Sequence, residues 1–234
     1  MVKHITGSDH RGWLDSHFHI PFAEYFNDDH IRCGVLNVIN DDLIEPGAGF
    51  DTHQHEETEI ITYVVEGELT HTIGKGSKRT LTRGHVQYMS AGTGVYHSEH
   101  NWGQEPLRLL QIWIFPDKTY YDPNYGDHRF EWDERVDKWM PVASGDVLSP
   151  APIKIHADVN ICAAEITRGG ELDFAVGRDR QAYLLLIEGE ARVAGLTLSA
   201  GDAAEIVEED VTITAGDTAH VLVLEMKKEK GVTG

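Results

Sequence analysis

The sequence predicts an all-β protein built as two barrels in one chain. Residues 59–66 are rich in β-branched and aromatic residues and end at a glycine turn, which is typical of a strand. The pattern of residues 63–68 returns at 185–190, 122 positions later, and the turn at 82–85 returns at 199–202, 117 positions later. A chain of 234 residues is long enough for two domains of ordinary size, each with its own core.

The expected domain boundaries follow from this duplication. We expect a first barrel over residues 1–116, a connection over 117–152 and a second barrel over 153–234. The connection is irregular, with a short helix expected around 131–140. It is rich in aromatic residues that a flexible linker would lack, namely Tyr120, Tyr121, Tyr125, Trp132 and Trp139.

Two pairs of potential metal ligands lie in the first half of the chain. His53 and His55 are two residues apart, and His97 and Glu99 form a second such pair, 42 residues after His55. Side chains two apart on a strand point to the same face, so two neighbouring strands would bring all four together. In a chain with 14 histidines a single pair is more often a surface feature. The second pair, framed by Gly92 and Gly94, favours a metal site.

The residue types indicate the class of metal. Imidazole nitrogen with one carboxylate suits a first-row divalent transition metal, whereas calcium and magnesium prefer oxygen ligands. Four protein ligands leave positions open for water, substrate or dioxygen, which is typical of a catalytic centre. Spacing alone leaves the carboxylate open, because Glu57 and Glu59 would share the face of His53 and His55 on an unbulged strand.

The second copy lacks these ligands. Offsets of 122 and 117 place Ala175, Gly177, Thr214 and Gly216 at the four positions. His156 and His220 are isolated there, and isolated histidines are more often hydrogen-bonded structural residues than ligands. The sequence therefore predicts one metal site, in the first barrel.

Two glycine-framed motifs make the chain resemble a known superfamily. Gly47-x5-His53-x-His55-x3-Glu59 resembles the first cupin motif, and Gly92-x-Gly94-x2-His97-x3-Asn101 resembles the second. Within the cupins, residues 38–42, 53–67, 89–99 and 111–114 resemble the pirin family. Seven residues separate Glu59 from Gly67, where the general cupin motif has six. The resemblance implies a bicupin, with two jelly-roll β-barrels and short helical or irregular connections.

The resemblance also implies a ligand set. Pirins use the glutamate two residues after the third histidine, so His53, His55, His97 and Glu99 are the implied metal ligands. Glu59 then becomes a carboxylate outside the ligand set or at the rim of the site. The implied cofactor is one divalent transition metal, with iron as the first choice and manganese, nickel, copper, cobalt or zinc as alternatives.

Two functions are implied by the resemblance. Pirin-like quercetin 2,3-dioxygenases cleave a flavonol with dioxygen and release carbon monoxide, a reaction in which Glu99 would be the catalytic base. The flavonol could stand in for another small aromatic substrate. The alternative is a metal- or redox-dependent regulatory protein that binds a protein partner without turnover. We favour the enzyme on the analogy with the family.

The charge balance excludes some partners. A net charge of −19, from 20 basic and 39 acidic side chains, argues against direct nucleic-acid binding, which depends on Lys and Arg. No apolar stretch is long enough to span a membrane. Cys33 and Cys162 form neither a disulfide framework nor a redox motif, so a reducing cytoplasm is the expected location.

Overall fold

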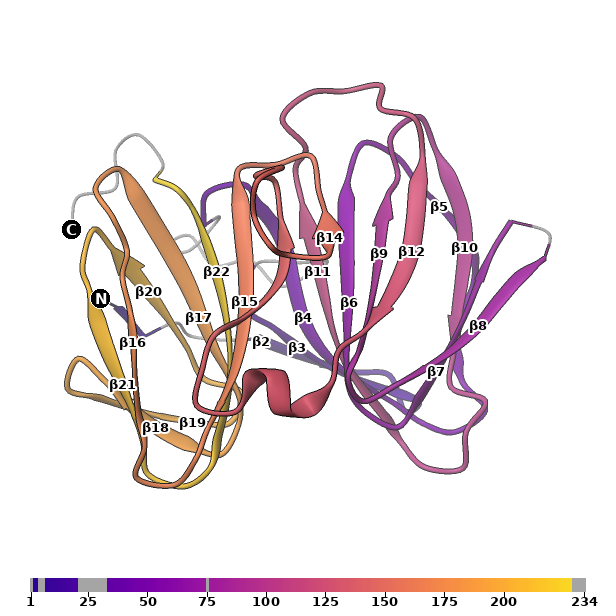
Figure 1. The fold of residues 1–234 in the computed structure, drawn as a ribbon. Coiled ribbons are helices and arrows are strands. Elements are labelled where there is room, and N and C mark those ends of the chain that lie inside the picture. Colours follow the sequence, from indigo (N-terminus) through magenta and orange to yellow (C-terminus); the bar gives the residue numbers. More distant parts are fainter. Residues whose placement is uncertain (1, 4–6, 21–32, 75, 229–234) are drawn as a thin grey trace. The chain divides into compact units, whose positions relative to one another are not determined.

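The computed structural model describes residues 2–3, 7–20, 33–74 and 76–228 (Figure 1). The chain forms two compact units. The N-terminal barrel comprises residues 7–31 and 35–130, and the C-terminal barrel comprises residues 1–6, 32–34 and 131–234. The described elements are strands apart from one 3-10 turn, Trp132–Arg135. The predicted all-β class is therefore confirmed.

The N-terminal barrel consists of two antiparallel sheets. The large sheet has the strand order β12 (Asn124–Arg129), β9 (His85–Ser90), β6 (Glu59–Glu66), β11 (Leu107–Ile114), β4 (Leu36–Ile44), β3 (Leu14–Phe18) and β2 (Gly7–His10). The small sheet has the order β5 (Gly49–His55), β10 (Val95–His100), β7 (Glu68–Ile73) and β8 (Ser77–Thr82). The small sheet carries both ligand pairs, one on β5 and one on its neighbour β10 (Figure 1).

Apolar side chains from both sheets form the core of this barrel. Val64 and Leu107 of the large sheet pack with Leu69 and Leu81 of the small sheet, and none of the four is more than 1% exposed. Strand β6 is buried along almost its whole length, which explains why its sequence is a continuous apolar run without alternation. Each such buried side chain stabilises the fold by about 1.5–3 kcal/mol relative to exposure.

The C-terminal barrel repeats this topology. Its large sheet has the order β1 (Val2–Lys3), β20 (Ala203–Val207), β17 (Arg180–Glu188), β22 (Ala219–Lys227), β15 (Val159–Ile166), β13 (Met140–Ser144) and β14 (Ile153–Lys154). Its small sheet has the order β16 (Glu171–Phe174), β21 (Val211–Ala215), β18 (Glu190–Val193) and β19 (Leu196–Ser199). The central strands β6 and β17 both end at a positive-φ glycine, Gly67 and Gly189. The duplication seen in the sequence is therefore a duplication of the fold.

Residues 117–152, expected to form a separate connection, are divided between the two units. Strand β12 pairs with β9 in the N-terminal barrel, whereas β13 pairs with β15 in the C-terminal barrel. The short helix expected around 131–140 is the 3-10 turn Trp132–Arg135. The change of unit falls between residues 130 and 131.

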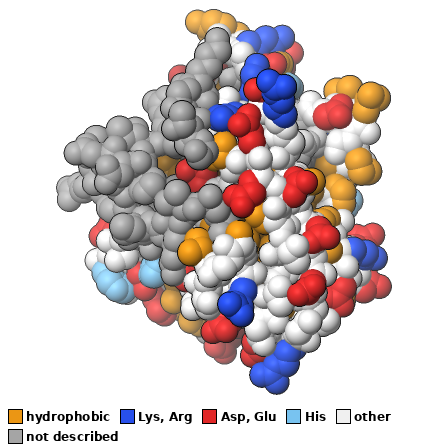
Figure 2. Space-filling view, turned by 90° about the vertical axis from the view of Figure 1, so that its left-hand side faces the viewer, with side chains coloured by type: hydrophobic (Ala, Val, Ile, Leu, Met, Phe, Trp, Pro, Cys, Tyr) orange, Lys and Arg blue, Asp and Glu red, His pale blue; other side chains and the backbone are white. Residues whose placement is uncertain are grey.

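The acidic composition is visible on the surface. On the face drawn in Figure 2, acidic side chains are spread over the visible part, and basic side chains lie in separate groups among them. Cys33 and Cys162 are free thiols. Within the described ranges, no helix is long and apolar enough to cross a membrane.

Candidate metal centre

Three of the predicted ligands converge in the N-terminal barrel. Strands β5 and β10 are antiparallel neighbours, and His97 lies directly opposite His53. The Nε2 atom of His53 is 2.9 Å from Nε2 of His55 and 3.0 Å from Nε2 of His97. Three imidazole nitrogens at such short distances form a group that could hold one metal ion.

Glycines allow β10 to enter the site at this register. Gly92 has a φ of 45°, and a Cβ atom there would lie 2.0 Å from the carbonyl oxygen of Tyr121. A Cβ atom on Gly49 would lie 2.2 Å from the carbonyl oxygen of Glu99, where β5 approaches β10. Only glycine fits these two positions without displacing the backbone. The glycine frame of the motif therefore sets how closely the two ligand strands approach.

Glu99 lies near His97 but falls outside the compact group of His53, His55 and His97. The register of β10 against β5 shifts between His97 and Glu99, because of a bulge. Its Oε2 accepts a hydrogen bond of 2.5 Å from Nε2 of Gln111, and its Oε1 accepts one of 3.3 Å from the Thr62 hydroxyl. Burial raises the pKa of Glu99 to about 7, partly offset by the hydrogen bond from Thr62. Glu99 forms a second possible ligand group with His71 and His97.

His71 is a site residue that the sequence did not reveal. It lies on β7, opposite Glu99, and its Nε2 is 2.9 Å from Nδ1 of His97. It is 3% exposed. No second histidine or carboxylate lies two residues from His71 in the sequence, and it joins the site only through the pairing of β7 with β10. The available signal was the even separation from the Gly67 turn, which places residues 69, 71 and 73 on one face.

His55, His71 and His97 are held in the neutral form that binds metal. Burial and, to a lesser extent, the neighbouring His53 lower the pKa of His55 to about 4. Burial also lowers the pKa of His71 to about 4 and that of His97 to about 2, where the adjacent histidines add to the effect. A site made of neutral imidazoles accepts a cation without first releasing protons at neutral pH.

The other candidate carboxylates point elsewhere. Glu59 is 2% exposed and accepts a hydrogen bond of 2.7 Å from the Ser90 hydroxyl. Glu57 has a φ of 50° in the turn between β5 and β6, and its carboxylate accepts from the Tyr120 amide. Glu57 and Glu59 therefore do not lie on the same strand as His53 and His55, because β5 ends at His55 and the chain turns before β6. Neither lines the cavity that the histidines share.

That cavity has a volume of about 190 Å³. We call it the metal cavity. Its apolar wall is made by Phe50 and Trp113, and its polar wall includes Asn40 and Asp42 of β4. Asp42 accepts a hydrogen bond of 2.5 Å from the Ser16 hydroxyl, and burial raises its pKa to about 7. The cavity is lined in full by Asn40, Asp42, Phe50, His53, His55, His97, Glu99, Gln111 and Trp113.

Two other residues of the sequence motifs have structural roles. Asn101 is fully buried, and its side chain donates to the carbonyl oxygens of Ile44 and Glu105. His100 stacks on Trp102 with a centroid distance of 4.7 Å and lies outside the lining of the metal cavity. The second cupin-like motif thus supplies the ligand strand β10 and the turn that follows it, which the Asn101 side chain stabilises.

The C-terminal barrel has apolar residues where the site would be. The amide of Asn101 donates to Ala48 and its carbonyl accepts from Gly47, and Ala215 makes the same two bonds with Gly170 and Gly169. This match corrects the expected alignment, which placed Thr214 and Gly216 at the second ligand pair. With this alignment, the strand pairings show which residues of the C-terminal barrel are equivalent to His53, His71, His97 and Glu99. They are the apolar residues Phe174, Val193, Val211 and Ile213, in that order.

Val193, Val211 and Ile213 are buried in the core of the C-terminal barrel, and Phe174 packs against that core. The offset failed by three residues because β20, β21 and the loop between them span residues 203–215, three fewer than the span 85–100 of β9, β10 and their loop. The expectation that this copy has no ligands there is unaffected. His220, expected to be structural, is 2% exposed and lies 2.9 Å from a Glu188 carboxylate oxygen.

Comparison with known proteins identifies the family. The family described as Pirin matches residues 2–114, and the one described as Quercetinase C-terminal cupin domain matches residues 140–226. A pirin-like protein of Caulobacter vibrioides is 38% identical over 222 residues, which cover 94% of this chain and 95% of the relative. The chain belongs to the pirin family. Another relative, named quercetin 2,3-dioxygenase, from Escherichia coli K12, is 34% identical to this pirin over 222 residues, 94% of each chain.

Solved structures agree with the fold of this pirin. Escherichia coli YhhW superposes with a TM-score of 0.90 at 33% identity, over 96% of this chain and 95% of that one. The structure described as bacterial pirin YhhW in complex with nickel(II) gives a TM-score of 0.89 at 33% identity, over 96% of both chains. The predicted bicupin architecture is confirmed.

Proposed function

We propose that His53, His55, His97 and Glu99 hold one divalent transition metal ion. The convergence of three imidazoles supports this, since the donor set suits a first-row metal. Glu99 lies next to His97 in the lining of the same cavity and can complete the set. The structure described as bacterial pirin YhhW in complex with nickel(II), which shares this fold, supports a divalent transition metal as the ion. Iron is our first choice for the native metal.

We further propose that the protein is a dioxygenase that opens the central ring of a flavonol, yielding a depside and carbon monoxide. The observation that carries this is a buried carboxyl of raised pKa beside the three-histidine cluster. A base with a pKa near the working pH is well suited to accept the proton of a flavonol 3-hydroxyl group. When bound, the metal supplies a Lewis acid that favours the ionised hydroxyl.

The residues around Glu99 orient the carboxylate that would accept this proton. Gln111 and Thr62 both donate to the carboxylate, so its oxygens keep a defined direction in the cavity. Phe50 and Trp113 form the apolar wall against which a flat ring would lie. Exclusion of water from this buried wall strengthens the interaction between Glu99 and the hydroxyl.

The size of the metal cavity restricts how the substrate sits. Sites for drug-sized ligands usually have volumes of about 300–1,000 Å³. At about 190 Å³, the metal cavity encloses the hydroxyl- and carbonyl-bearing ring of a flavonol, and the pendant phenyl ring extends beyond it. Smaller aromatic compounds with adjacent hydroxyl and carbonyl groups should fit entirely.

Oxygen uptake tests this function. The full chain, loaded separately with iron, manganese, nickel, copper, cobalt and zinc, would be given a flavonol and the matched flavone that lacks the 3-hydroxyl group. We expect oxygen consumption and carbon monoxide release with the flavonol only. Metal binding without flavonol-dependent oxygen uptake under any metal would overturn the enzyme proposal and favour a metal-dependent regulatory protein. Absence of metal binding would overturn the site itself.

A further inference from the structure

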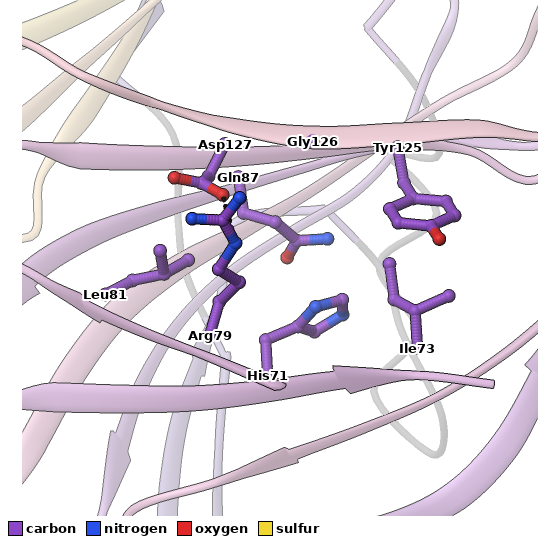
Figure 3. A pocket seen from close by; sticks show the side chains of 8 residues that line it. All are labelled: His71, Ile73, Arg79, Leu81, Gln87, Tyr125, Gly126 and Asp127. Carbon is purple, nitrogen blue, oxygen red and sulfur yellow. Dashed lines mark ion pairs between the residues drawn. The ribbon is translucent and has the colours of Figure 1, made fainter. Parts of the chain in front are cut away.

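A second cavity lies between the β7–β8 hairpin and strands β9 and β12 (Figure 3). We call it the hairpin cavity; it has a volume of about 110 Å³. Its lining shares no residue with that of the metal cavity. The side chains that matter here are His71, Ile73, Arg79, Gln87, Tyr125 and Asp127.

Gln87 gives this cavity an unused hydrogen-bonding edge. The side chain is 2% exposed, and within the described part of the chain neither its amide nitrogen nor its amide oxygen has a hydrogen-bond partner. Buried polar groups are nearly always paired, because a buried amide without a partner loses its bonds to water. Exchanging the nitrogen and oxygen positions would not alter this, since both are without a partner. A donor and an acceptor thus face the cavity side by side.

The charges around the cavity cancel. Nε of Arg79 lies 3.6 Å from a carboxylate oxygen of Asp127, and Figure 3 draws this ion pair on one side of the Gln87 amide. The Arg79 side chain is 69% exposed, so the pair lies at the solvent side. A neutral occupant needs no further counter-charge, whereas a carboxylate would compete with Asp127 for the guanidinium group.

The remaining wall is apolar. Ile73 and the ring of Tyr125 lie together on the side away from the ion pair (Figure 3). A cluster of water molecules would leave this wall in contact with water, whereas a molecule with one polar edge and a short apolar body would cover it. A volume of about 110 Å³ admits only a few non-hydrogen atoms.

We propose that the hairpin cavity is a binding site for a small neutral molecule that carries a primary carboxamide group. Its amide edge pairs with the Gln87 amide through two hydrogen bonds, and its alkyl part covers Ile73 and Tyr125. His71 reaches the cavity from the opposite wall, and its Nε2 contacts Nδ1 of His97. The ligand therefore touches a residue that orients the histidine cluster.

Nuclear magnetic resonance titration with propionamide tests this inference. The reporters are the side-chain amide signals of Gln87 and the ring signals of His71 and His97, followed in both the metal-free and the zinc-loaded full chain. We expect saturable shifts of all three residues. Measurement on the metal-free chain keeps this result independent of whether the proposed metal centre binds its ion.

Matched probes and variants define the outcomes. Gln87→Leu should weaken binding by about tenfold or more, judged from the His71 signals, because the paired amide bonds are lost. Ile73→Trp, which fills the cavity without altering Gln87, should abolish it, and Gln104→Leu, at an exposed glutamine, should leave it unchanged. Saturable binding of propionate with equal affinity would contradict a neutral ligand. Shifts that stay linear with concentration, or persist in Ile73→Trp, would show that propionamide does not bind in the hairpin cavity and would overturn the proposal.

Discussion

Nε2 of His71 lies 2.9 Å from Nδ1 of His97. If Nε2 of His97 binds a metal, its Nδ1 must carry the ring proton and donate a hydrogen bond to Nε2 of His71. His71 then accepts at Nε2 and carries its own proton at Nδ1. One buried contact therefore fixes the ring orientation and the tautomer of a proposed ligand, which is how outer residues raise the affinity of metal sites.

Replacing His71 should weaken metal binding without removing a ligand. In His71→Leu the Nδ1 atom of His97 loses its acceptor, and we expect metal affinity to fall by roughly 10–100-fold, as is typical for such orienting residues. Affinity would be measured by competition with a chelator, and the absorption spectrum of the cobalt-loaded protein would report the ligand geometry. His71→Gln, which can still accept a hydrogen bond, should recover part of the loss.

His100→Leu is the matched control for this substitution. His100 stacks on Trp102 and lies outside the metal cavity, so its loss should leave the affinity for metal unchanged. Equal affinity in His71→Leu and in the unmodified chain would show that His97 needs no partner to hold its orientation.

The same residue should make the metal-free protein sensitive to acid. Burial lowers the pKa of His71 to about 4, whereas an unfolded histidine titrates near pH 6.5. Between these values the unfolded chain binds more protons, so the free energy of unfolding falls as the pH is lowered. We expect His71→Leu to lose less stability than the unmodified chain between pH 7 and pH 4.5. Urea unfolding of both metal-free proteins across that range would measure the difference, and parallel curves would contradict it.

Much of the fold could be predicted from the sequence because its signals are local. The strand around residues 59–66, its glycine turn and the repeat of both in the second half indicated two β-barrels. The i,i+2 spacing of His53 and His55 placed both on one face of β5. These features depend only on strand periodicity, which a single sequence displays.

The parts that could not be predicted depend on pairing between distant strands. His71 joins His97 only because β7 lies beside β10, and the same pairing sets His71 opposite Glu99. The three-residue error at Val211 and Ile213 has a different origin, since a fixed offset does not represent the shorter span of β20 and β21 relative to β9 and β10. The spacing of residues in the sequence could predict the two strands that carry the candidate ligands. It could not predict that His71 of the neighbouring strand β7 contacts His97.

Substitutions at Glu99 and His53 should separate chemistry from metal binding. Glu99→Gln keeps three histidines and a similar shape, so we expect it to retain metal while turnover falls by roughly a hundredfold or more, as for loss of a general base. His53→Ala removes a central nitrogen of the cluster and should lose metal and activity together. Metal content and flavonol-dependent oxygen uptake would be measured on both variants at equal protein concentration.

Glu59→Gln controls for loss of a buried carboxylate elsewhere. Glu59 accepts from Ser90 and does not line the metal cavity, so this variant should keep both metal and turnover. Full activity of a metal-replete Glu99→Gln variant would remove Glu99 from the proton-accepting role.

Asp42 should make the metal-free protein less stable at alkaline pH. Burial raises its pKa to about 7, so the folded state holds a proton that the unfolded chain releases near pH 4. The stability from this protonated group is complete at low pH and is lost as the pH rises through 7. Asp42→Asn keeps an oxygen for the Ser16 hydroxyl and carries no charge.

We therefore expect the free energy of unfolding of the Asp42→Asn variant to equal that of the unmodified chain near pH 4 and to exceed it at pH 8.5 by an amount on the order of a few kcal/mol. Urea unfolding at the two pH values would measure this, with the fully exposed Asp51→Asn as a control that shows no such gain. A variant that is no more stable than the unmodified chain at pH 8.5 would mean that Asp42 ionises in the folded protein without cost.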